Sequence, residues 1–75
     1  MKELALFVVK KLVDKPEAVS IEESRDGDVE VFKLVVDESD KGKVIGKQGK
    51  VIKSIRAVVG AAASKAGRQV VVEID

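Results

Sequence analysis

The apolar residues of this 75-residue chain switch between helical and strand spacing, and the order of the switches limits the folds open to it. Three segments repeat apolar side chains at helical spacing: residues 2–14, 42–45 and 50–66. Three others have the apolar, alternating character of strands: residues 18–25, 29–37 and 69–74. The predicted order is therefore helix, strand, strand, helix, helix, strand.

Turn residues separate these segments, and the sheet that results needs a cover. Pro16 ends the first helix, Asp26-Gly27 indicates a tight hairpin, and Gly67 stops the last helix. The last strand follows a helical crossover, so at least one strand pair is expected to be parallel. We expect one α+β domain over residues 1–75, with three helices packed on one face of a three-stranded mixed sheet.

Missing residue types exclude several classes of function. The chain has no cysteine and no histidine, so the commonest zinc ligands and the usual acid–base group at neutral pH are absent. Gly42 and Gly46 are one residue too close for a nucleotide-hydrolysing P-loop, and Gln48 replaces its Ser or Thr. The clustered carboxylates are predicted to be solvated: Glu22, Glu23, Asp37, Glu38 and Asp40. We therefore expect neither an enzyme nor a cofactor or metal site.

Charge is divided unevenly along the chain, although the net charge is only +1. Residues 1–40 hold six basic and eleven acidic residues, whereas residues 41–75 hold eight basic and two acidic ones. This division favours a polyanion as a partner of the second half, although two ordinary solvated faces would also produce it. No apolar run approaches the ~20 residues that span a bilayer, and no signal peptide is visible. We expect a cytoplasmic protein.

Two glycines, Gly46 and Gly49, interrupt the basic stretch between the second and third helices. Gly46 can close one helix in a left-handed conformation, and Gly49 leaves the first-turn amides of the next helix uncovered. Those amides, the positive end of the helix dipole and the neighbouring lysines predict a site for one anion, such as a nucleic-acid phosphate. The alternative is that the two glycines only form a tight turn between helices.

The stretch "GKVIGKQGKVIKSIR" resembles the KH-domain signature Ile-Gly-x-x-Gly-x-x-Ile, and the element order is that of the type II, prokaryotic KH domain. "LVDKPEAVSIEE" and "AAASKAGRQVVVEI" extend the resemblance over essentially the whole chain, to small bacterial proteins made of one KH domain. The resemblance implies binding of single-stranded RNA, with residues 46–49 clamping the backbone of about four nucleotides. The RNA-binding residues expected on this basis are Lys43, Ile45, Gly46, Lys47, Gln48, Gly49, Lys50, Ile52, Lys53 and Arg56. Among them, Ile45 and Ile52 match the apolar positions that line or support the base groove.

The resemblance also implies partners. Proteins similar to this one are reported to self-associate and to pair with a larger KH-containing RNA-binding protein linked to bacterial cell growth and division. A role as a small RNA-binding regulator or RNA chaperone in cell shape and division is the corresponding expectation. Membranes and small-molecule substrates are not expected as partners.

An interaction module is the alternative to an RNA-binding function. Small residues recur on the outer face of the long helix, opposite its apolar stripe: Ala57, Gly60, Ala61 and Ser64. Such a face lets a second backbone come close, and we expect it to form a homodimer, although alanine is also simply a good helix former. In the first helix the apolar stripe is predicted to hold Leu4, Ala5, Val8 and Leu12, with Phe7 off it as a buried residue or a partner contact.

Overall fold

The computed structural model describes residues 1–74 and has the predicted order of elements. The helices and strands are α1 (Lys2–Leu12), β1 (Ser20–Asp26), β2 (Val29–Val35), α2 (Lys41–Ile45), α3 (Lys50–Lys65) and β3 (Gln69–Ile74). Three short 3₁₀ turns lie between them: η1 (Pro16–Ala18), η2 (Glu38–Asp40) and η3 (Lys47–Gly49). None of the helices over residues 1–74 is long and apolar enough to cross a membrane.

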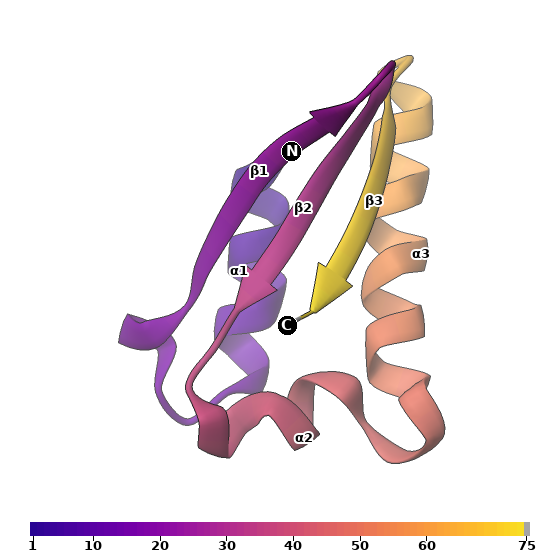
Figure 1. The fold of residues 1–75 in the computed structure, drawn as a ribbon. Helices are drawn as coiled ribbons and strands as arrows, with labels where there is room; N and C mark the ends of the chain where they lie inside the picture. Colours follow the sequence, from indigo (N-terminus) through magenta and orange to yellow (C-terminus); the bar gives the residue numbers. More distant parts are fainter. Residues whose placement is uncertain (75) are drawn as a thin grey trace.

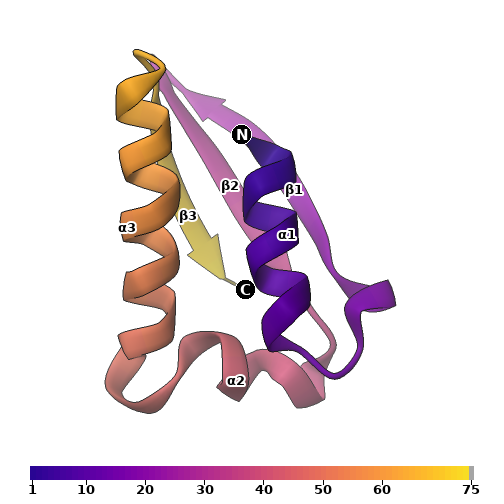
Figure 2. The same ribbon diagram turned by 180° about the vertical axis from the view of Figure 1, so that it is seen from behind.

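The sheet has the order β1-β2-β3, with β2 in the middle (Figure 1). The β1–β2 pair is an antiparallel hairpin, and β2–β3 is parallel because α2 and α3 carry the chain back between them. Helices α1 and α3 run side by side over one face (Figure 2), and α2 lies across one end of that layer. The predicted α+β fold with a mixed sheet is thereby confirmed.

The core lies between this helical layer and the inner face of the sheet. Alternation along β2 buries Phe32 and Leu34, while Val31, Lys33 and Val35, which alternate with them, lie on the other face of the sheet and are half-buried. Val72 from β3 and Val59 from α3 complete the centre, each at most 2% exposed. Helix α2 contributes one buried residue, Val44.

Helix α1 is rotated from the predicted orientation. Its buried residues are Ala5 and Val9, which are four apart and face the sheet. Leu12, predicted on the buried stripe, is 38% exposed, and Phe7 is 62% exposed. The face beside α3 is therefore left partly open to solvent.

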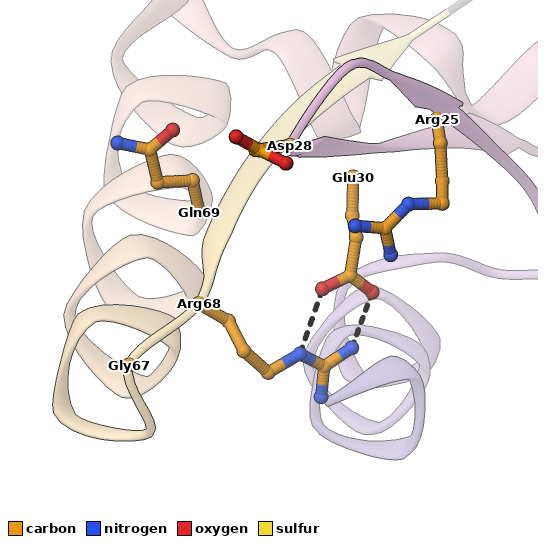
Figure 3. Close-up of a pocket in the computed structure, with 6 residues that line it drawn as sticks. All are labelled: Arg25, Asp28, Glu30, Gly67, Arg68 and Gln69. Carbon is orange, nitrogen blue, oxygen red and sulfur yellow. Dashed lines mark hydrogen bonds and ion pairs between the residues drawn. The ribbon is translucent and has the colours of Figure 1, made fainter.

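An arginine–glutamate pair ties the start of β3 to β2 (Figure 3), at the end of the molecule remote from α2 (Figure 1). Arg68 donates from Nε to Glu30 Oε2 at 2.7 Å and from a second nitrogen to Oε1. This bidentate pair holds the pKa of Glu30 below its ordinary value, mainly through the hydrogen bond. The polar hollow around it is lined by Arg25, Asp28, Glu30, Gly67, Arg68 and Gln69.

Candidate nucleic-acid interface

The bend between α2 and α3 is built from three residues with positive φ. Gly46 has φ 76° and ψ 172°, a combination almost confined to glycine, and Gly49 is left-handed at φ 75° and ψ 15°. Between them, Gln48 also has a positive φ of 58°. The backbone therefore turns sharply over η3, and the side chains of Lys47 and Gln48 are exposed at its tip.

The two glycines are required for different reasons. A Cβ on Gly46 would lie 2.4 Å from Val51 Cγ2 and 2.8 Å from the Val51 amide nitrogen, closer than real Cβ atoms come. A Cβ on Gly49 would meet only Ile52 Cγ2, at 3.9 Å. Packing and backbone conformation both demand glycine at 46, whereas only backbone conformation favours it at 49.

The backbone amides around the bend are partly used by the bend itself. The Gly49 amide donates to Gly46 O at 3.1 Å, and the Lys50 amide donates to Lys47 O. No side chain caps the amino end of α3 at Gly49. The predicted anion site therefore lacks two of the expected donors but keeps an uncovered end of a 16-residue helix, with its positive dipole.

Three lysines surround this helix end without ion-pair partners among residues 1–74. Lys47, Lys50 and Lys53 are all exposed, and the salt bridges and hydrogen bonds of the described chain involve none of their ammonium groups. Lys43, the next predicted contact, differs because its ammonium pairs with the Asp14 carboxylate. That hydrogen bond raises the pKa of Lys43.

The apolar residues predicted beside the bend do not share one environment. Ile45 is 38% exposed, so its side chain is open to a ligand. Ile52 is only 5% exposed and belongs to the core with Ile55 and Val59. Of the two roles expected for Ile52, lining or supporting the base groove, its burial favours support, because the first turn of α3 packs its side chain into the core. Its Cγ2 lies 3.9 Å from the position that a Cβ on Gly49 would take, so Ile52 packs against the bend from the side of the core.

Arg56 connects α3 to the edge of the sheet. Its Nε donates to Val72 O at 2.9 Å, so the guanidinium lies between α3 and β3. The predicted contact residues consequently differ in position. Lys47 and Gln48 lie in the bend, Lys50 and Lys53 in the first turns of α3, and Arg56 further along α3 beside β3. Lys43 is turned toward the end of α1.

The prediction for Asp40 is wrong. Predicted to be solvated, it is 1% exposed, and its two carboxylate oxygens accept hydrogen bonds from the Asp14 and Lys15 amides at 3.1 Å each. Those partners are 26 and 25 residues away in sequence, so no local pattern could have identified the contact. Nearby Asp37 behaves more locally, accepting from the Ser39 hydroxyl and amide, which lower its pKa.

Two surfaces of the helical layer are available to a protein partner. The predicted small-residue face is exposed at Ala57, Ala61 and Ser64 and half-buried at Gly60. A separate apolar groove lies between α1 and α3, with Val58 49% and Leu12 38% exposed. The residues lining the groove are Val8, Leu12, Lys50, Val51, Ser54, Ile55 and Val58.

Comparison with known proteins gives matches over nearly the whole chain. The family model described as KhpA/KhpB, KH domain matches residues 2–74. RNA-binding protein KhpA of Clostridium perfringens is 51% identical over 74 residues, 99% of each chain. RNA-binding protein KhpA of Listeria monocytogenes is 45% identical and that of Chlamydia trachomatis 42%, each over 99% of this chain and 97% or 95% of theirs. These relatives are named as RNA-binding proteins and not as enzymes.

Solved structures of Era share the fold. A crystal structure of Aquifex aeolicus Era bound to GDP and AlF4⁻ matches with a TM-score of 0.65 and 21% identity. A structure of Era with MgGDPNP and nucleotides 1506–1542 of 16S ribosomal RNA matches with a TM-score of 0.68, also at 21% identity. Each match covers 97% of this chain and 28% of the Era chain. By its family model and its relatives, this chain belongs to the KhpA/KhpB KH-domain family.

Proposed function

We propose that this chain binds single-stranded RNA at the bend between α2 and α3. The observation that carries the proposal is the uncovered amino end of α3, preceded by the Gly46–Gly49 bend and surrounded by three lysines without acidic partners among the described residues. The names of the relatives support it, since they are RNA-binding proteins. The structure of Era in complex with a segment of 16S ribosomal RNA supports it as well, because a protein that contains this fold is there bound to RNA.

Binding proceeds through the RNA backbone. A phosphate lies against the bend, where Gly49 places no side chain in its way and the dipole of α3 attracts it. Lys47, Lys50 and Lys53 neutralise this phosphate and its neighbours. The bases lie beside Ile45 and the surface between α3 and β3 that holds Arg56. About four nucleotides occupy one such site.

Sequence preference at this site is weak. The chain has only two aromatic residues, and neither is placed to stack on a base near the bend. Phe32 is 1% exposed in the core, and Phe7 lies on α1. Recognition then depends on phosphate contacts, on aliphatic contact at Ile45 and on hydrogen bonds to base edges.

A salt titration tests the proposal. Fluorescence anisotropy of a labelled, unstructured RNA oligonucleotide is measured against protein concentration at several KCl concentrations. If three phosphates are neutralised, the slope of log K against log salt is about −2, using about 0.7 per phosphate for single strands. No binding at low salt, or binding that is independent of salt, contradicts the proposal.

Self-association is the second function that we propose, and the groove between α1 and α3 now favours it independently of the small-residue face. Val58 and Leu12 expose apolar surface there. Val51, which also lines the groove, packs against Gly46. A second copy of the chain, or a larger KH-containing protein, would cover one of these two surfaces. Paired domains would then hold two RNA segments and gain avidity.

The cellular role follows from these two properties. We propose that residues 1–75 act as one KH domain in the cytoplasm, as a small RNA-binding regulator or chaperone. Weak sequence preference and two binding sites in one assembly suit a protein that holds many RNAs rather than one. Crosslinking to RNA in cells followed by sequencing tests this: recovery of many unrelated transcripts supports the role, and recovery of none contradicts it.

A further inference from the structure

The carboxylate of Asp40 does not form the hydrogen bond that is usual for an aspartate at its position. It immediately precedes α2, where an aspartate ordinarily accepts a hydrogen bond from its own helix. No such cap hydrogen bond is present. Both carboxylate oxygens bind instead to the amides of Asp14 and Lys15, in the segment that follows α1.

Besides Asp40, helix α2 is held by the buried side chain of Val44 and by the packing of Gly46 against Val51. It is five residues long, far shorter than a helix that is stable alone. Only Val44 anchors it in the core. Val44 and the Gly46 contact both lie toward the carboxyl end of the helix, and the carboxylate of Asp40 supplies the fixed point at its amino end.

The surroundings of Asp40 extend this attachment at the surface. Lys43 of α2 pairs with the Asp14 side chain, and Lys15 pairs with Asp37 at 3.6 Å. Both pairs join the same two segments that Asp40 joins, but they are exposed and therefore weak. The buried carboxylate is the contact that water does not compete for.

We propose that Asp40 is a positioning residue for the Gly46–Gly49 bend. By binding the Asp14 and Lys15 amides, it holds α2 in one orientation, and Gly46 follows directly on the last residue of α2. The bend is then presented to RNA already in place, which removes an ordering cost from binding. This inference rests on the proposed RNA-binding function of the bend.

Two substitutions and a matched control test the proposal. Asp40→Asn keeps the shape but only one acceptor oxygen, and Asp40→Ala removes both. Val59→Ala is the control, because it removes buried methyl groups from α3 well away from α2. RNA affinity is measured by anisotropy at a temperature where each variant is fully folded by circular dichroism.

If the bend of an Asp40 variant holds the RNA-binding conformation about a tenth of the time, its affinity falls about tenfold. We expect a loss of about this size in both Asp40 variants. Val59→Ala is expected to lower the melting temperature without changing the affinity. Equal affinity of Asp40→Asn and the wild type overturns the proposal, and so does an equal loss in Val59→Ala.

Amide hydrogen exchange keeps this test separate from the test of RNA binding. In the wild type the Asp14 and Lys15 amides are expected to exchange slowly, and in Asp40→Asn the amides of residues 41–49 are expected to exchange faster than those of β2. If the wild type binds no RNA but these exchange results hold, the proposed function fails and the positioning role of Asp40 stands. Fast exchange of the Asp14 and Lys15 amides in the wild type overturns the positioning role of Asp40.

Discussion

Gly46 lies directly against Val51: a Cβ built on the glycine would come within 2.4 Å of Val51 Cγ2. The contact joins the end of α2 to the first turn of α3, and it requires φ 76° and ψ 172° at Gly46. Gly46 is therefore needed for the packing of α2 against α3, whether or not a ligand is bound. Gly49 has no comparable contact, so the two glycines can be separated by experiment.

Gly46→Ala is expected to destabilise the protein by at least about 2 kcal/mol, since the overlap with Val51 adds to a backbone conformation that only glycine adopts readily. Gly49→Ala is the matched control and should cost about 1 kcal/mol, because only its left-handed backbone is strained. Urea unfolding without RNA measures both. Equal losses in the two variants would contradict the packing at Gly46.

Asp14→Asn is expected to strengthen RNA binding and to steepen its salt dependence. The substitution releases the ammonium of Lys43, which is then available to one more phosphate, while the Asp14 amide can still donate to Asp40. The slope of log K against log salt should become more negative by about 0.7. Lys43→Gln is the control and should leave the wild-type slope nearly unchanged. An unchanged slope in Asp14→Asn shows that Lys43 does not reach the RNA.

Acid is expected to weaken the fold partly through Glu30. Arg68 holds the pKa of Glu30 below its ordinary value, so this carboxylate stabilises the fold fully above the unfolded pKa of about 4.3. The contribution is lost as the pH falls through the lowered pKa, because the folded state must then take up a proton.

Glu30→Gln should therefore lose less stability on acidification than the wild type, as measured by urea midpoints from about pH 6 to about pH 3. Glu17→Gln is the control, since Glu17 is exposed and has no ion pair among the described residues. A Glu30→Gln profile that parallels the wild type would show that the Arg68 pair does not contribute.

Gly60→Ala distinguishes a bare helix face from an interface. A Cβ on Gly60 would meet nothing within 4 Å in the folded chain, so the monomer should gain about 1 kcal/mol from the better helix former. If the small-residue face packs closely on a second copy, the added methyl should also weaken association in light scattering.

Val58→Glu is the companion variant, because it places a charge in the groove between α1 and α3 instead. Loss of the dimer in Val58→Glu but not in Gly60→Ala assigns the interface to the groove. If the wild type stays monomeric at high concentration in light scattering, the proposed homodimer is contradicted.

Much of the fold could be predicted because its signals are local. The change of apolar spacing revealed each helix and strand, and the glycines marked the bend between α2 and α3. Ile52 carried two signals. Its place on the apolar stripe with Ile55 and Val59 predicted burial, which the structure confirms, while its predicted support of the base groove stays a prediction.

The contacts that orient the bend could not be predicted, because their partners are distant in sequence or lie in the backbone. Asp40 resembles any solvated aspartate until the Asp14 and Lys15 amides are placed beside it. The role of Gly46 likewise depends on where Val51 lies. Arg56 could be recognised as basic, but its hydrogen bond to Val72 O required the position of β3.

The most direct measurement compares RNA binding by the wild type with that of the double variant Lys47→Asp, Gln48→Asp. Both side chains are exposed, and aspartate tolerates the positive φ of Gln48, so the melting curve should not change. Lys47→Asn, Gln48→Asn controls for shape without adding anions. We predict that the aspartate variant binds no RNA oligonucleotide at salt concentrations where the wild type binds. Wild-type affinity in that folded variant would contradict it.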